Sequence, residues 1–155
     1  MEEKREPRWL SDDEQRDWRA FVETTQLLVN RLDTDLHRDA GLSHADFEIL
    51  VRLSEADGLR LRMSELADQA LFSRSRLSHA VTRLESAGLV RREACPGDRR
   101  GTLAVLSEVG AGRLRQAAGG HVETVRRYVI DVLPDTELTE LGRISCRIRA
   151  ALEAG

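Results

Sequence analysis

The chain has 155 residues and a formal net charge of −3; 41% of its residues are hydrophobic, 33% charged and 4% aromatic. This length suits one domain with a core of its own, and this composition is typical of a helical protein with much exposed surface. No apolar run approaches the ~20 residues of a membrane span, and the charged N-terminus lacks the apolar core of a signal peptide, so the sequence predicts a cytoplasmic protein without membrane contact.

The first predicted element is an amphipathic helix over residues 12–39, which follows an N-terminal arm over residues 1–10. Ser11 and Glu14 form a capping-box pattern at its start, and apolar residues then recur at the spacing of one helix face. Gly41 suits its end, because glycine adopts the left-handed conformation that closes many helices.

Three shorter helices are predicted next. Ser43 caps the first of them and Gly58 ends it. A short extended piece, about residues 60–63, leads to the second, which Ser64 is expected to cap, and the third spans residues 73–88. Two short helices separated by a few residues make a candidate helix-turn-helix.

A hairpin is predicted after these helices, with strands at about residues 89–94 and 102–107. Between them lies the segment CPGDRRG, residues 95–101, in which Pro96 and Gly97 are good turn formers. The pattern predicts a hairpin whose loop is longer than the two-residue kind.

The C-terminal part is predicted to hold a long helix after Ser107 and a last helix whose first turn contains Pro134. Gly119 and Gly120 lie in the middle of the long helix and each costs roughly 1 kcal/mol relative to alanine, so we expect a kink or a loose turn there. The last helix carries one apolar stripe, formed by Leu138, Leu141, Ile144, Ile148 and Leu152.

The first and last helices carry more apolar surface than the helix-turn-helix and the hairpin can cover. The simplest solution is a homodimer in which these helices pack against their copies; the alternative is an internal bundle within a monomer. Trp9 and Trp18 are interpreted as dimer packing, with a wall of a ligand cleft as the alternative.

Basic residues are concentrated in one part of the chain. Residues 73–101 hold seven arginines and three carboxylates, a local charge of +4, so the remainder of the chain carries −7. A local basic surface of this kind suits a nucleic-acid partner, and arginine forms planar, forked contacts with phosphate.

A helical projection of residues 73–88 places four apolar residues on one face. The opposite side presents short polar groups framed by arginines, with Glu85 near the end as the only carboxylate. Short hydroxyls let a helix approach base edges, and arginines contact phosphates or guanine. This pattern favours a DNA-recognition helix over an ordinary solvated face.

The hairpin that follows would place its tip beside the DNA backbone. Arg99 or Arg100 could then enter the neighbouring minor groove, where the negative potential attracts a guanidinium group. Asp98 would repel phosphate if it faced DNA, so we expect it to hydrogen-bond loop amides or to pair with an arginine.

The stretch MSELADQALFSRSRLSHAVTRLESAGLVRREACPGDRRGTLAVLSEVG resembles the winged helix-turn-helix of MarR-type transcription regulators. The wing signature of that family is Asp-x-Arg, a spacer, and Leu-Thr-x-x-Gly. Here it reads Asp98-Arg99-Arg100-Gly101, then Leu106-Ser107-Glu108-Val109-Gly110, with Ser107 in place of the usual threonine.

The resemblance implies a mainly α fold with a small β-hairpin wing, and a dimer through the N- and C-terminal helices. It divides the chain into an arm (1–10), a dimerisation helix (11–39), a DNA-binding lobe (43–108), and a long helix with a C-terminal dimerisation helix (109–155). It implies a repressor that binds a pseudo-palindrome in double-stranded DNA and responds to a small aromatic or lipophilic anion, whose binding residues the sequence does not indicate. The expected DNA-binding residues are Ser64, Ser73, Arg74, Ser75, Arg76, Ser78, His79, Thr82, Arg83, Asp98, Arg99 and Arg100.

Functions of other classes are weaker matches to the sequence. It has no phosphate-binding glycine loop, nucleophile elbow or HExxH pattern, so neither an enzyme nor a cofactor is expected. A small-molecule-binding helical protein without DNA function stays open.

Thiol- and metal-responsive regulators of the same fold also stay open. Cys95 and Cys146 are expected to be free thiols, although Cys95 lies near arginines that could lower its pKa, which would suit a thiol-responsive regulator. No metal site is expected, because none of the histidine pairs has the i, i+4 spacing of a helical metal site; the histidines are His37, His44, His79 and His121.

Overall fold

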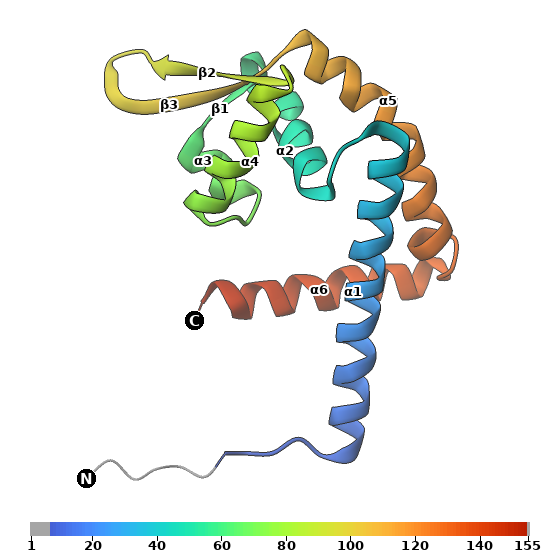
Figure 1. Ribbon diagram of the computed structural model, residues 1–155. Helices are drawn as coiled ribbons and strands as arrows, with labels where there is room; N and C mark the ends of the chain where they lie inside the picture. The colour runs from blue at the N-terminus through green and yellow to red at the C-terminus, as the bar shows by residue number, and fades with distance from the viewer. Residues whose placement is uncertain (1–6, 155) are drawn as a thin grey trace, which may run out of the picture.

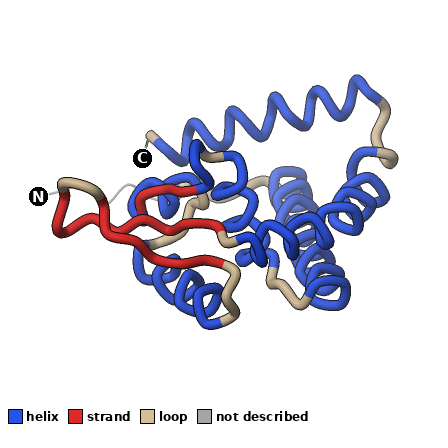
Figure 2. The backbone as a smooth tube through the Cα atoms, turned by 90° about the horizontal axis from the view of Figure 1, so that it is seen from above, coloured by secondary structure: helices blue, strands red, loops and turns tan. Residues whose placement is uncertain are grey.

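A computed structural model describes residues 7–154, except for the side chains of Arg99 and Arg100. The described chain is mainly helical, with one small antiparallel sheet (Figures 1 and 2). The helices are α1 (Asp12–Ala40), α2 (His44–Glu55), α3 (Met63–Gln69), α4 (Arg74–Ser86), α5 (Glu108–Val125) and α6 (Asp135–Glu153), and the strands are β1 (Arg60–Arg62), β2 (Val90–Cys95) and β3 (Asp98–Leu106).

The ends of α1 follow from local sequence signals. The Ser11 hydroxyl accepts a hydrogen bond from the amide of Glu14 at 3.2 Å, and the Glu14 carboxylate accepts one from the amide of Ser11 at 2.8 Å. Gly41 closes the helix with φ of 64°, and its amide donates to the carbonyl of His37 at 3.0 Å. The predicted capping box and glycine end are therefore confirmed. Of the expected arm, residues 1–6 lie outside the described residues.

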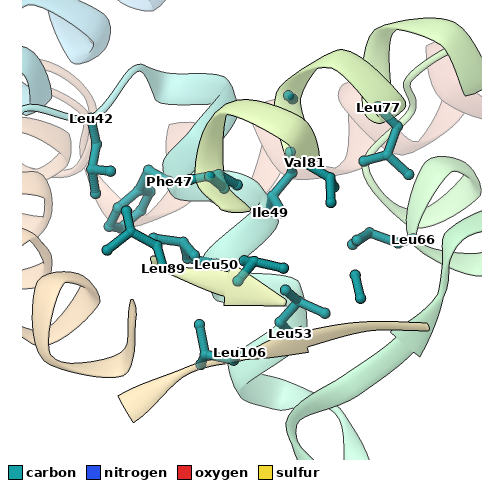
Figure 3. Packing of buried hydrophobic residues seen from close by; sticks show 14 of the residues in the cluster. Leu42, Phe47, Ile49, Leu50, Leu53, Leu66, Leu77, Val81, Leu89 and Leu106 are labelled. Carbon is teal, nitrogen blue, oxygen red and sulfur yellow. The ribbon is translucent and has the colours of Figure 1, made fainter. Parts of the chain in front are cut away.

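The hydrophobic core lies in the lobe formed by α2, α3, α4 and the sheet (Figure 3). The apolar face predicted for residues 73–88 is confirmed, since all four of its residues are buried. They pack with α2, α3 and both long strands. The largest fully buried side chains are Ile49, Leu50, Leu53, Leu66, Leu77 and Val81.

The sheet has the strand order β1-β3-β2. The extended piece predicted at 60–63 is β1, which pairs antiparallel with β3, and β3 pairs antiparallel with β2. The expectation of a long hairpin loop is wrong: β2 ends at Cys95 and β3 begins at Asp98, so only Pro96 and Gly97 lie between the strands. Gly97 has φ of 78°, which a Pro-Gly turn of type II requires at its second central residue.

Residues 99–101 are thus part of β3, where the strand carries an irregularity opposite Ala94 and Cys95. Thr102 pairs with Ala94 and Asp98 pairs with Cys95, so three residues of β3 have no counterpart on β2. This bulge explains why the alternation of apolar and polar residues in β3 does not continue to the hairpin turn.

Two helix boundaries differ from expectation. The N-cap of α3 is Arg62, whose amide donates to Glu65 at 3.3 Å, so Ser64 lies within the first turn and does not cap the helix. Similarly, α2 ends at Glu55, and Gly58 lies in a following 3-10 turn, Asp57–Leu59, with φ of 66°.

The glycine pair in α5 does not interrupt the helix. The α-helical segment runs through Gly119 and Gly120, and the departure from it comes later, as a π-helical turn at Arg126–Ile130. A Cβ on Gly120 would lie 3.1 Å from a carboxylate oxygen of Asp39. The glycine therefore lets α5 approach α1 closely.

The two end helices extend beyond the lobe. Figure 1 shows the N-terminal half of α1 continuing past the lobe, and Figure 2 shows α6 running along one side of the molecule. Within the described residues, α6 has no buried side chain. Four residues of its predicted apolar stripe are exposed, among them Ile144 at 42% and Leu152 at 78%, and Leu138 is partly buried. No described helix is long and apolar enough to cross a membrane.

Candidate nucleic-acid interface

The helix predicted to read DNA, α4, begins where the sequence indicates. Ser73 is its N-cap, and the Ser73 hydroxyl accepts a hydrogen bond from the amide of Arg76 at 3.2 Å. The expected DNA-binding residues of this helix are all exposed on the side away from the core: Ser73, Arg74, Ser75, Arg76, Ser78, His79, Thr82 and Arg83. Ser64, in the first turn of α3, is also exposed.

Two of the arginines that flank this face, Arg76 and Arg83, are held by neighbouring side chains. The guanidinium of Arg76 lies 4.0 Å from the centre of the Phe72 ring, a cation–π contact. Arg83 pairs with Asp46 of α2 at 2.9 Å, and the Asp46 carboxylate is only 13% exposed. Such contacts limit where each guanidinium can lie, and so they restrict the direction from which a phosphate can be bound.

Arg92 of β2 contacts the polar face of α4, which the sequence did not predict. Its guanidinium pairs with Glu85, and it donates to the carbonyl of Ser78 at 3.1 Å and to the hydroxyl of Thr82 at 3.0 Å. The only carboxylate of α4 is therefore neutralised by a residue of the wing. A signal was available, because a lone carboxylate at the end of a basic helix is followed, a few residues later in the chain, by two arginines.

The wing is anchored to the lobe through Asp98. Its carboxylate accepts a hydrogen bond from Arg62 of β1 at 2.8 Å, so Asp98 pairs with an arginine, one of the two roles expected for it. Cys95 is buried beside it, and a Cβ on Gly101 would lie 2.7 Å from an Asp98 carboxylate oxygen and 2.8 Å from the Cys95 sulfur. The backbone of Arg99 and Arg100 belongs to β3, but their side chains lie outside the described residues.

A buried carboxylate, Asp35, links α1 to α5. It accepts hydrogen bonds from Thr124 at 2.9 Å, from Arg31 at 3.1 Å and from Arg38 at 2.8 Å. Burial raises the pKa of the Asp35 carboxyl, but the Thr124 hydroxyl and the two guanidinium groups outweigh it and hold that pKa below its usual value. Beside this group lies a cavity of ≈ 280 Å³, which Arg127 and Tyr128 of the π-helical turn also line.

The histidines considered for a metal site are only partly brought together. His121 of α5 lies 6.3 Å from His44 between ring centres, and 4.5 Å from the ring of Phe47. Among the described residues, no group of three or more His, Cys, Asp or Glu side chains has the arrangement that holds a metal ion. The Nδ1 atom of His121 is buried and has no hydrogen-bond partner in the described part of the chain.

We expect His121 to make the folded protein sensitive to acid. Partial burial, then the nearby His44, lower the pKa of its imidazole, and Glu48 opposes them. The folded state thus binds fewer protons than the unfolded state, so stability is full above the unfolded pKa of about 6.5 and falls as the pH drops through the folded value. Urea unfolding at pH 5–8 should show this fall in wild type and a shallower one in His121→Leu. Equal slopes in the two proteins would contradict this expectation. The difference between them at pH 8, where His121 is neutral, gives the effect of the substitution on packing.

Comparison with known proteins agrees with this geometry. The sequence pattern of the MarR family matches residues 40–101, the lobe and most of the wing. The fold is similar to a crystal structure of AbsC, a MarR family transcriptional regulator from Streptomyces coelicolor, with 48% identity, coverage of 96% of this chain and 100% of that one, and a TM-score of 0.91. The chain belongs to the MarR family of transcriptional regulators.

Two further relatives support this MarR-family assignment. Sco3205, a MarR family transcriptional regulator from Streptomyces coelicolor solved in complex with DNA, has 48% identity, covers 94% of this chain and 92% of its own, and superposes with a TM-score of 0.92. The HTH-type transcriptional regulator PecS of Dickeya dadantii is 27% identical over 127 residues, which are 81% of this chain and 76% of that protein. A MarR-family chain is a transcription regulator and not an enzyme, as the sequence predicted.

Proposed function

We propose that the protein binds double-stranded DNA sequence-specifically, as a homodimer in the cytoplasm, and represses transcription from a pseudo-palindromic operator. The observation that carries the proposal is the exposed face of α4, on which short polar groups lie between arginines and the only carboxylate is paired with Arg92. A helix of this kind suits the major groove, and the hairpin beside it suits the adjacent minor groove. The crystal structure of the relative Sco3205 with DNA supports the same partner.

The homodimer rests on apolar surface that one subunit leaves uncovered. In α1, Trp18 and Phe21 are about half exposed and their rings lie 6.2 Å apart, and α6 exposes four of the five residues of its apolar stripe. Monomeric proteins rarely expose contiguous apolar surface of this kind, so a second copy is its natural occupant. Because the stripe of α6 is exposed, an internal bundle within one chain is disfavoured.

The proposed function predicts steep salt dependence. For each phosphate contacted, the logarithm of the association constant should fall with the logarithm of salt concentration by about 0.9. Arg99→Ala should weaken binding to all duplexes and reduce this slope by about one. Arg143→Ala, which removes an arginine paired with Glu140 on α6, is the matched control and should leave the slope unchanged. Titration of labelled promoter fragments at several salt concentrations measures the affinity and the slope for each protein. An association constant of wild type that does not change with salt concentration would overturn the proposed function.

A response to a small effector is a further part of the proposal. It is supported by the cavity between α1 and α5, where Arg31, Arg38 and Arg127 lie among the carboxylates of Asp35, Asp39 and Glu123, with Arg31 5.3 Å from the centre of the Tyr128 ring. Arg31 and Arg38 pair with Asp35, so Arg127, next to Tyr128, is the lining guanidinium that we expect to meet the carboxylate of an aromatic acid. Calorimetry with aromatic acids tests this with and without operator, because a ligand releases DNA only if it binds the two states with different affinity.

A further inference from the structure

Thr82 occupies the exposed face of α4, but its hydroxyl group is already used inside the protein. The hydroxyl donates to the carbonyl of Ser78 at 2.9 Å, one helical turn earlier, and accepts from Arg92 at 3.0 Å. A threonine hydroxyl has one proton to donate, so this one cannot also donate to a guanine or thymine oxygen.

Several contacts hold the Arg92 side chain beside Thr82. Its side chain is 27% exposed, and besides Thr82 and Ser78 it pairs with Glu85, whose carboxylate also accepts from the Arg92 amide at 3.2 Å. The guanidinium thus has three acceptors on α4. Freeing the Thr82 hydroxyl would require a hydrogen bond to be lost from a charged donor, which weakens the fold of the lobe.

The serines of the same face differ from Thr82. The hydroxyl groups of Ser75 and Ser78 are exposed and make no hydrogen bond within the described part of the chain. They can donate to base edges or accept from them. The polar face of α4 therefore contains two hydroxyls that are available to DNA and one threonine that offers its methyl group.

We propose that Arg92 is a positioning residue and Thr82 a specificity-determining residue that recognises a thymine methyl group through its own methyl group. This inference rests on the proposed function. The thymine C5-methyl lies in the major groove, where an apolar side-chain group can contact it and distinguish thymine from the other bases. With its hydroxyl held by Arg92, the Thr82 side chain is fixed in one rotamer, so the methyl is presented in one direction.

The test uses an operator that the wild-type protein selects from random duplexes. Each thymine of that operator is replaced in turn by deoxyuridine, which removes only the C5-methyl group. Wild type should lose about four-fold in affinity at one thymine of each half-site, the value of one buried methyl. Thr82→Val keeps a methyl in place, and valine holds one χ1 rotamer in a helix without needing a hydrogen bond, whereas threonine divides between two. Thr82→Val should therefore retain that four-fold sensitivity, and Thr82→Ser should lose it.

Arg92→Lys provides the second arm, because an ammonium group keeps the charge but cannot reach Glu85, Ser78 and Thr82 together. It should reduce the deoxyuridine sensitivity while leaving the salt slope unchanged, a combination that a simple loss of folding or of a phosphate contact would not give. Retained sensitivity in Thr82→Ser, lost sensitivity in Thr82→Val, or an altered salt slope in Arg92→Lys would overturn the inference. If wild type selects no sequence at all, the proposed function itself fails.

Discussion

Replacing Gly110 by alanine is expected to lower the free energy of unfolding by about 3 kcal/mol, the upper part of the range for overpacking a well-packed site. A Cβ at this position would lie 2.1 Å from the carbonyl oxygen of Leu89 and 2.9 Å from a methyl carbon of Leu106. The same Leu89 carbonyl accepts hydrogen bonds from the amide of Ser107 at 3.1 Å and from its hydroxyl at 3.0 Å. The start of α5 would have to move away from Leu89, in the turn before β2, and these hydrogen bonds would weaken.

The matched control is Gly119→Ala in the same helix. Among the residues that the structure describes, no atom outside the local helix backbone lies within 4 Å of a Cβ there, and Gly119 is in regular α-helix. Alanine should therefore stabilise the protein by roughly 0.5–1 kcal/mol. Urea unfolding at one fixed protein concentration measures both variants, since the midpoint of the proposed dimer would depend on concentration. If both substitutions shift the midpoint in the same direction, then close packing is not the reason that position 110 requires glycine.

The parts of the fold that the sequence predicted are those with local causes. Ser11 with Glu14, Ser73 and Gly41 act within four residues of their own backbone partners, so their spacing in the sequence is sufficient to place helix ends. The buried face of α4 was predicted for the same reason, because helical periodicity is a local property. The sequence indicated that the last helix carries more apolar surface than the lobe can cover. Only the structure shows that the described lobe buries no residue of α6.

The features that sequence reasoning missed depend on contacts between distant segments. Arg62 with Asp98 and Arg83 with Asp46 join residues that are 36 and 37 positions apart. No spacing rule predicts which arginine reaches which carboxylate, since the pairing depends on how the helices pack against the sheet. The short turn at Pro96 and Gly97 was missed because the bulge in β3 breaks the period-two pattern from which strands are recognised.

At the candidate interface, helical periodicity decides which side chains are exposed, and contacts with other segments decide how these side chains are oriented. The sequence indicates which residues of α4 are exposed, but the partners of Arg76, Arg83 and Thr82 decide what each can offer to DNA. Two arginines of the face are already oriented by neighbours, and the threonine has its hydroxyl engaged. A pre-ordered face of this kind loses less side-chain entropy on binding than a solvated one.

Placing two glutamates on the apolar stripe of α6 should abolish the proposed dimer and weaken operator binding by at least about 100-fold. Ile144 and Ile148 lie on the same side of α6, are 42% and 41% exposed, and would bring four carboxylates together in a symmetric dimer interface. The loss in DNA affinity follows because a dimer binds its second half-site intramolecularly, at an effective concentration that separate subunits lack, an advantage of about 10²–10⁴. Analytical ultracentrifugation and operator titration measure the two effects of Ile144→Glu/Ile148→Glu on one preparation.

The control places the same charges on the other side of the same helix. Thr139 and Ala150 lie about half a turn away from the stripe at 100° per residue, and both are exposed, so Thr139→Glu/Ala150→Glu should remain dimeric with unchanged operator affinity. The two double variants carry the same net charge, so non-specific repulsion between glutamates and DNA phosphates would weaken both alike. A stripe variant that is monomeric yet binds full-length operator as tightly as wild type would show that each lobe acts alone. In that case the exposed stripe on α6 would serve a purpose other than pairing two recognition helices.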